Sequence, residues 1–394
     1  MDLNPFAYEF HENPYPLYRA LRDGAPLYRN DQLDFWALSR FRDVHDALDD
    51  WQTYSSAEGI VLERLDPRML EATPMMIFLD PPRHDRLRKL VSRTFTPRRV
   101  AGLEPFIRQI AARLLEPLAA RGGGDFVHDF SGPLPMDVIF TLLGVPEGDR
   151  AQLRAWTDLA LDRDPDTPEL PPRAIEASML AMRYWFELLP ELRRHPNDGL
   201  VCGLFEAEIE GDDGRVTRLT DGEIIGFCQL IGAAGTETTT KLLGNAAVLF
   251  ARHPDEYRKV LADSGRLAGA VEEVLRHSPP AQYAARTVGR DVEWYGQTVP
   301  KGARILLLIG SANRDEREYP APDDFDIERQ ITNPIGFGRG VHYCLGASLA
   351  RLESRVGLEE FVKRFPRYTV DESRCRRVHM SNVHGFESVP FACA

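Results

Sequence analysis

The sequence predicts a mainly α-helical protein with small antiparallel β-sheets. Most long segments place apolar residues three or four positions apart, as in amphipathic helices, and alternation with a period of two is confined to short stretches. Thr220 and Glu223 also have the spacing of a capping box, in which each side chain satisfies a backbone amide at the start of a helix. The helix that begins there is predicted to reach residue 253, a length of roughly 45 to 50 Å, so it crosses a whole domain.

The other elements follow in chain order from the same two periodicities. A first helix is predicted at residues 15–22 and a first strand at 33–39. Helices dominate the middle and the C-terminal part, at residues 99–120, 133–143, 150–161, 173–194 and 349–365. Further strands are predicted at residues 292–299, 303–308 and 386–391. No flexible linker, repeat or low-complexity segment divides the 394 residues, so residues 1–394 are expected to form one domain.

The composition excludes several classes of function. A net charge of -12 without a dense basic run repels phosphate backbones, so nucleic acid is not an expected partner. The first residues do not resemble a signal peptide, and the longest apolar stretch, residues 224–236, is shorter than the roughly 18 residues that a bilayer span needs. Five scattered cysteines form no disulfide framework, which indicates a reducing compartment. We expect a cytoplasmic monomer without a membrane segment.

The most informative motif is the run from Phe337 to Gly346, which reads FGRGVHYCLG. Glycines at 338, 340 and 346 allow the backbone to turn tightly or to approach a flat ligand closely. Cys344 stands just before the apolar residues of the last predicted helix, and a helix N-terminus favours a thiolate through its dipole and free amides. A cysteine presented in this way is suited to bind a metal ion.

This run matches the pattern Phe-Gly-x-Gly-x-His-x-Cys-x-Gly and therefore resembles the cysteine-ligand loop of the cytochrome P450 family. The resemblance covers nearly the whole chain and implies the cytochrome P450 fold, in which haem b lies between a long distal helix and the proximal cysteine loop. It implies that Cys344 is the thiolate ligand of the haem iron and promotes cleavage of the oxygen–oxygen bond. Other loop residues implied to contact the cofactor are Phe337, Gly338, His342 and Gly346.

Two other interpretations of this loop fit its residues less well. A His-x-Cys pair could be half of a zinc site, but no second Cys or His pair lies at zinc-ligand spacing nearby. A merely buried cysteine would not explain the three glycines.

A second motif lies in the middle of the predicted long helix. Residues 232–239 are rich in Gly and Thr, which are weak helix formers, so a requirement other than helix stability selects them. By resemblance they match the distal-helix pattern of the family at Ala234, Gly235, Glu237 and Thr238, with the two small residues close to the cofactor. Thr238 would order dioxygen and water, and Glu237 would connect the site to solvent protons. The alternative is a Thr-rich helix with an exposed Glu.

A buried ionic cluster is also implied. Glu273 and Arg276 lie three residues apart on one helix side and fit the Glu-x-x-Arg motif of the family. The family buries this pair together with an arginine of a later irregular segment, which corresponds here to Arg329. We expect this cluster to be required for haem incorporation, because a buried charge left unpaired is costly.

The two propionates of haem need cations or hydrogen-bond donors when they leave water. In the family these groups come from the helix at the haem edge, from a strand and from the cysteine loop. They correspond here to His84, Arg88, Arg286 and His342.

The segments that line the substrate pocket of the family are mostly apolar in this chain. They correspond to Ile60, Met75, Met76, Leu230, Ala233, Ala234, Gln282, Tyr283, Val383 and His384. Gln282, Tyr283 and His384 could orient one or two substrate oxygens in an otherwise apolar pocket. We therefore expect a hydrophobic small molecule as the substrate, such as a steroid, a terpenoid, a lipid or a polyketide-type natural product.

Nothing in the chain supplies electrons, since no flavin or nicotinamide motif accompanies the predicted haem unit. The resemblance implies that NAD(P)H electrons arrive through a ferredoxin reductase and a ferredoxin. A basic docking patch is predicted at Arg86, Lys89, Arg93, Arg339 and Arg351, unless these are scattered surface charges.

The predicted activity is that of a haem-dependent monooxygenase that activates dioxygen and hydroxylates or otherwise oxidises its substrate. One alternative is a peroxygenase driven by hydrogen peroxide, although bacterial peroxygenases of this fold typically carry Arg-Pro in place of the acid and the alcohol. The other alternative is a haem protein that binds a ligand without turnover.

Overall fold

The computed structural model describes residues 1–63, 68, 71, 73–94, 96–162, 164, 169–210 and 214–394, with the backbone alone at residues 93, 94, 97, 209 and 210. The longer helices are α7 (Glu104–Arg121), α8 (Pro133–Leu143), α9 (Glu147–Ala160), α10 (Pro172–Arg194), α12 (Asp221–Arg252), α14 (Leu267–His277) and α16 (Ala347–Arg364). The other helices are α1 (Tyr8–Glu12), α2 (Tyr15–Gly24), α3 (Phe41–Asp49), α5 (Arg83–Thr94), α6 (Pro97–Ala101), α11 (Leu200–Phe205), α13 (Pro254–Ala262) and α15 (Ile309–Ala312).

The strands form small sheets. The largest has the order β1 (Leu27–Asn30), β2 (Phe35–Leu38), β10 (Arg304–Leu307), β7 (Ala284–Val288) and β3 (Tyr54–Ser55). Within it β2 and β10 are parallel, so this sheet is mixed rather than wholly antiparallel. The remaining strands pair antiparallel. A three-stranded sheet has the order β11 (Tyr368–Val370), β14 (Pro390–Cys393) and β4 (Gly123–Asp125). The two-stranded sheets are β12 (Arg376–Arg377) with β13 (Phe386–Ser388), β5 (Glu208–Glu210) with β6 (Val216–Arg218), and β8 (Val292–Trp294) with β9 (Gln297–Val299).

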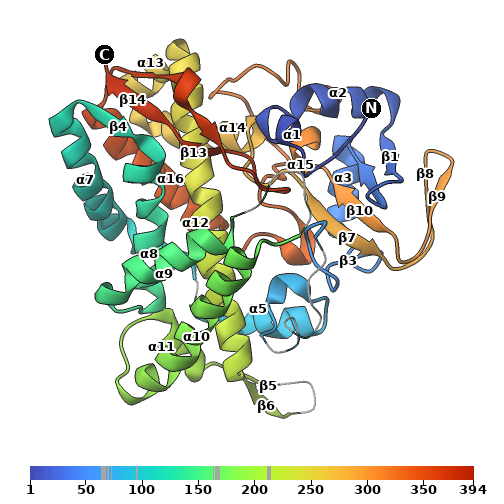
Figure 1. Cartoon of the computed structure of the whole chain (residues 1–394), viewed down its shortest axis with the longest axis horizontal. Coiled ribbons are helices and arrows are strands. Elements are labelled where there is room, and N and C mark those ends of the chain that lie inside the picture. The colour runs from blue at the N-terminus through green and yellow to red at the C-terminus, as the bar shows by residue number, and fades with distance from the viewer. Residues whose placement is uncertain are drawn as a thin grey trace.

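Helix α12 runs through the middle of the molecule, with the helices α7 to α11 on one side and the five-stranded sheet on the other (Figure 1). The predicted capping box is present at its start, where Thr220 Oγ1 accepts from the amide of Glu223 and the Glu223 carboxylate accepts from the amide of Thr220. With 32 residues, α12 is about 48 Å long. It therefore contacts most of the other long helices and fixes their positions.

The core is divided between the two sides of the molecule. The largest cluster of buried apolar side chains joins α7, α8, α12, α14 and α16, and includes Phe126, Phe130 and Phe361. Two smaller clusters cover the faces of the five-stranded sheet, one beside α3 and the other beside α2. Because β7 contributes to both smaller clusters, its side chains alternate between the two faces of the sheet.

Most predicted helices lie within a few residues of their expected bounds, but the helix predicted at residues 99–120 is two helices, α6 and α7. Pro105 lies in the first turn of α7 and has no N–H to donate to a preceding carbonyl, a position where proline favours the start of a new helix. The strand predicted at residues 292–299 is also wrong, because β8 and β9 form a hairpin. Its two turn residues, Tyr295 and Gly296, both have positive φ, as a tight two-residue hairpin turn requires.

Candidate active site

The cysteine loop is folded tightly onto itself immediately before α16. The amide of Cys344 donates to the carbonyl of Phe337 at 2.9 Å, which closes the loop. Gly338 and Gly340 have φ values of +68° and +61°, a region that disfavours other residues. A Cβ atom at Gly340 would also lie 3.1 Å from the carbonyl oxygen of Leu48 in α3. The loop therefore needs glycine for its turn and for its contact with α3, and it leaves the Cys344 side chain accessible.

The environment of the Cys344 thiol contains opposing influences. Desolvation by the surrounding protein is the larger effect and raises the pKa of Cys344, whereas the amides of Gly346 and Ala347 and the charges of Arg88 and Arg351 lower it. The amides at the start of α16 thus act in the predicted direction, but they do not outweigh desolvation. A metal ion bound to the sulfur would supply the positive charge that the thiolate needs.

Four nitrogen-bearing side chains from three elements converge near this loop. His84 and Arg88 come from α5, Arg286 from β7, and His342 from the short helical turn at Gly340–His342. The rings of His84 and His342 have their centroids 4.5 Å apart. Desolvation, together with the charges of Arg286, His84 and Arg88, lowers the pKa of His342 to about 3. We call His84, Arg88, Arg286 and His342 the cradle.

The cradle has one acidic partner among the described residues, Asp85, whose Oδ1 lies 2.9 Å from Nδ1 of His84. The Nε2 atoms of His84 and His342 are buried without a hydrogen-bond partner. Among the residues that the structure describes, no acid forms an ion pair with Arg88 or Arg286, although burial lowers the pKa of Arg286 to about 10. Buried donors of this kind are normally satisfied. The donor set therefore fits a flat cofactor that carries two carboxylates, with the cysteine sulfur available to its metal.

The middle of α12 presents small residues and threonines. Ala234 is exposed, and Thr238 Oγ1 donates to the Ala234 carbonyl at 2.7 Å. Thr236 and Thr240 form the same bond to the carbonyl four residues earlier, at 2.7 and 2.9 Å, and such bonds tend to bend helices. A Cβ atom at Gly235 would lie 3.1 Å from Cδ1 of Ile139 in α8, so this glycine also allows close packing of α12 on α8. The proximity of Gly235 to the cofactor stays a prediction, and Ala234 is exposed.

The predicted acid of this motif has a partner that the sequence analysis missed. Lys241 Nζ lies 2.9 Å from Oε1 of Glu237, one turn earlier on the same helix, and both side chains are largely buried. The signal was present, since Glu and Lys four residues apart commonly pair on a helix. The alternative of an exposed Glu does not hold in this structure.

The structure brings Glu273, Arg276 and Arg329 together. Arg276 donates through Nε and Nη2 to the two oxygens of Glu273 at 2.7 and 2.8 Å, and Arg329 Nε lies 3.3 Å from Glu273 Oε1. The amide of Asp326 donates to the same oxygen at 3.0 Å. The carboxylate is fully buried, so this cluster ties α14 to the irregular segment that precedes the cysteine loop.

The apolar residues predicted for the substrate pocket come from segments that lie next to each other. The amide of Ala285 donates to the carbonyl of Ile60 at 2.8 Å, and Val383 pairs with Ala281 in an isolated β-bridge. Met75 precedes the short helix Met76–Phe78, which contacts α12, the helix that carries Leu230, Ala233 and Ala234. Between Ile60 and Met75, residues 64–67, 69, 70 and 72 lie outside the described residues.

Two of the polar residues predicted for the pocket form hydrogen bonds to other parts of the protein. Gln282 accepts from Tyr18 Oη at 3.2 Å and donates to the Pro279 carbonyl at 2.7 Å, and Tyr283 Oη donates to Ser381 Oγ at 3.0 Å. Both groups are buried and engaged within the protein, and their role toward substrate oxygens stays a prediction. His384 is also buried, and its ring lies 5.9 Å from the Tyr15 ring of α2.

In the predicted basic patch, three arginines have acidic partners, whereas Lys89 is exposed and has no acid within ion-pair distance among the described residues. Arg339 pairs with Asp49 at 2.9 Å, and Arg351 pairs with Glu272 at 2.5 Å. Arg86 binds Glu223 near the start of α12. The Arg93 side chain lies outside the described residues. These arginines do not form one free basic surface, because each described one has an acid within ion-pair distance.

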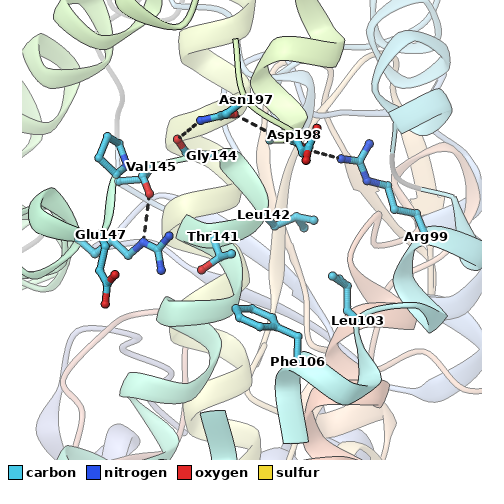
Figure 2. A pocket seen from close by; sticks show the side chains of 13 residues that line it. Arg99, Leu103, Phe106, Thr141, Leu142, Gly144, Val145, Glu147, Asn197 and Asp198 are labelled. Carbon is cyan, nitrogen blue, oxygen red and sulfur yellow. Dashed lines mark hydrogen bonds between the residues drawn. The ribbon is translucent and has the colours of Figure 1, made fainter. Parts of the chain in front are cut away.

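A recess of about 470 Å³ opens elsewhere, between the loops that follow α6, α8 and α10. Figure 2 shows Leu103, Phe106 and Leu142 at its floor, while Arg99 donates to the carbonyl of Asp198 at its rim. None of the predicted site residues lines this recess. It is separate from the cysteine loop and the cradle.

Comparison with known proteins agrees with these features. A family model for cytochrome P450 matches residues 186–383. A putative cytochrome P450 123 of Mycobacterium tuberculosis is 46% identical over 99% of this chain and 96% of its own length, and a vitamin D(3) 25-hydroxylase of Pseudonocardia autotrophica is 38% identical over 90% and 86%. Among solved structures, CYP109Q5 from Chondromyces apiculatus has a TM-score of 0.90 at 34% identity, covering 100% of this chain and 98% of its own. CYP109E1 from Bacillus megaterium in complex with corticosterone has a TM-score of 0.86 at 30% identity, covering 98% and 99%.

Within the described part of the chain, no helix combines the length and the apolar character that crossing a membrane would require.

Proposed function

This chain belongs to the cytochrome P450 family and is a monooxygenase, and from this premise we propose that it hydroxylates a hydrophobic small molecule with electrons from a separate ferredoxin. The family uses haem, and the cradle beside the accessible Cys344 is the observation that carries the proposal for this chain. When bound, haem activates dioxygen so that one oxygen atom enters the substrate and the other leaves as water, with two electrons and two protons consumed.

The chain's own residues would hold the cofactor from two directions. Cys344 would bind the iron through Sγ, with the amides of Gly346 and Ala347 directed at the sulfur. The buried nitrogens of the cradle would receive the two propionates and gain the partners that they otherwise lack. The ionic cluster of Glu273 would hold the segment before the cysteine loop in place.

The distal residues would deliver protons and shape the substrate site. Thr238 Oγ1 can exchange its bond to the Ala234 carbonyl for a bond to water or substrate oxygen, and the Glu237 carboxylate can pass a proton toward it. Ala234, Leu230, Met75 and Met76 would exclude water and present an apolar surface to the substrate. These residues give the pocket no charged group of their own.

A steroid-like scaffold is the proposed substrate class. The pocket segments are apolar, and the predicted polar groups Gln282 and Tyr283 are engaged within the protein, which favours a molecule with few polar groups. One relative is named a vitamin D(3) 25-hydroxylase, and one structural neighbour was solved with corticosterone.

A ligand panel tests this proposal. The purified haem protein is titrated with steroids, terpenoids, fatty acids and small aromatics, and displacement of the distal water is read as a shift of the haem Soret band. Compounds that shift the band are then incubated with NAD(P)H, a ferredoxin reductase and a ferredoxin, and products are identified by mass. A shift with steroids and a product heavier by one oxygen atom are expected. Shifts with small aromatics alone would refute the substrate class, and product with hydrogen peroxide but not with ferredoxin would refute the electron source.

A further inference from the structure

We propose that Glu63 determines substrate specificity by accepting a hydrogen bond from a hydroxyl group of the substrate, so that the enzyme prefers a steroid alcohol to the matching ketone. This inference rests on the proposed function and deepens it, because it names a polar group that the steroid-like substrate carries. Glu63 lies between Ile60 and Met75, within the proposed pocket segment.

Glu63 lies where three segments of the proposed pocket meet. It follows Ile60, whose carbonyl accepts from the amide of Ala285 at 2.8 Å. Its Oε1 atom accepts from Ser381 Oγ at 2.7 Å. The same Ser381 oxygen accepts from Tyr283 Oη at 3.0 Å. One residue from each segment therefore takes part in a hydrogen-bond network that ends at this carboxylate.

The hydrogens of this network are already used. Tyr283 Oη accepts from the amide of Leu62 at 3.4 Å and donates its own hydrogen to Ser381. Ser381 in turn donates its single hydroxyl hydrogen to Glu63. Burial raises the pKa of Tyr283, and the charge of Glu63 raises it too, so Tyr283 stays a protonated donor. The network thus runs in one direction and has no hydrogen left for the second oxygen of Glu63.

That second oxygen, Oε2, has no partner within the described part of the chain. It is buried without a hydrogen bond, and the whole residue is 8% exposed. Arg304, which also acts on Tyr283, donates instead to the carbonyls of Gly59 and Val61. Buried carboxylate oxygens are normally satisfied, and a group left without a donor is costly. We infer that the substrate supplies the donor.

Within the proposed substrate class, the group that can donate is a hydroxyl. A ketone oxygen carries no hydrogen, so a steroid ketone at this position would place two acceptors against each other. A site that hydrogen-bonds a substrate hydroxyl strongly rejects analogues that lack it, because the buried group of the protein is then left unpaired. Ser381 and Tyr283 act through Glu63, since they hold its carboxylate in place.

The first test compares alcohols with a ketone on one scaffold. Epiandrosterone and dihydrotestosterone each carry one hydroxyl group, at opposite ends of the same saturated ring system, and androstanedione carries ketones at both ends. Dissociation constants are measured from the Soret shift of the haem protein. The better of the two alcohols should bind about 10- to 100-fold more tightly than the dione, as expected for a hydrogen bond to a charged group. Equal or tighter binding of the dione would overturn the inference.

Glu63→Gln should reverse this preference. The amide keeps an oxygen for Ser381 and presents N–H groups where Oε2 was, so the dione should bind at least as tightly as the alcohols. A ratio that stays at the wild-type value would contradict the role of Glu63. Glu58→Gln is the matched control, because Glu58 is exposed and its Oε2 already accepts from Thr287 Oγ1 at 3.0 Å. Its ratio should equal that of the wild type.

Urea unfolding of the haem protein without substrate gives a readout that does not depend on the scaffold. Glu63→Gln should raise the unfolding midpoint, because it removes a buried charge that lacks a partner and retains the bond from Ser381. An unchanged or lower midpoint would mean that the carboxylate is already satisfied, and the inference would fail.

The outcomes separate this inference from the proposed function. If no steroid shifts the Soret band of the wild type, the proposed substrate class is refuted, and the terpenoid pair borneol and camphor provides the comparison of alcohol with ketone. If steroids shift the band without any preference for the alcohols, this inference alone is refuted.

Discussion

Replacement of Glu273 by Gln should remove much of the stability of the protein. The Glu273 carboxylate is 0% exposed and accepts from Arg276 Nε and Nη2, from Arg329 Nε and from the amide of Asp326, at 2.7 to 3.3 Å. The substitution leaves the Arg276 guanidinium, whose side chain is 1% exposed, without a counter-charge. Removing one partner of such a buried pair costs about 3 to 5 kcal/mol. This is a large fraction of the roughly 5 to 15 kcal/mol that stabilises a typical domain.

Loss of the Glu273 carboxylate should also affect haem binding. Its partner Arg276 donates to the carbonyls of Asn313 and Pro322 and thereby holds the segment that leads to the cysteine loop. Urea unfolding followed by tryptophan fluorescence and by the Soret band measures both effects. Glu328→Gln is the matched control, since Glu328 lies in the same segment but its side chain is 49% exposed, and a change of about 0 to 1 kcal/mol is expected. Glu273→Gln with full haem content and a free energy of unfolding within about 1 kcal/mol of the wild type would refute this reasoning.

Three further predictions concern other contacts. Cys344→Ser should abolish the strongly red-shifted Soret band of the reduced carbon monoxide complex, and its persistence would mean that another residue binds the iron. Gly340→Ala should lower haem content and cost about 1 to 2 kcal/mol in urea unfolding, because the positive φ disfavours a Cβ atom that also meets the Leu48 carbonyl, and a neutral result would contradict that contact. Burial lowers the pKa of His277 from 6.5 to about 2, so the folded protein binds fewer protons than the unfolded chain, and stability should fall as pH decreases from about 6.5. His277→Gln should flatten this dependence in unfolding experiments between pH 7 and pH 4.5, and an unchanged slope would assign it to other groups.

The features that the sequence predicts well depend on neighbours in the chain. The capping box of α12 and the cysteine loop are determined by residues a few positions apart, and the structure has both where the motifs indicate. The long helices follow for the same reason, since their apolar stripes repeat locally. The sequence signals for the break before Pro105 and for the turn at Tyr295 are also local. The continuous pattern of apolar residues around them nevertheless favoured one helix and one strand in the prediction.

Partner choice between distant segments was harder to predict. Gln282 was assigned to the substrate pocket, yet Tyr18, more than 260 positions away, occupies its amide oxygen. Gly235 was assigned to the cofactor, and its close approach to Ile139 of α8 was not predicted. The charges of Arg339 and Arg351 were read as a patch because their acids, Asp49 and Glu272, are distant in sequence. Such contacts depend on tertiary packing, which a single sequence does not display.

The two glycines in the middle of α12 differ in a way that matters for engineering a more heat-tolerant catalyst. At Gly235 an added methyl group would lie 3.1 Å from Cδ1 of Ile139, whereas at Gly232 the nearest atom, in the Phe140 ring, lies at 3.8 Å. Alanine in a helix interior is favoured over glycine by about 0.5 to 1 kcal/mol. The segment that carries the chemistry thus contains one position where rigidity can be added without displacing a neighbour, and another where the same change requires the Ile139 side chain of α8 to move.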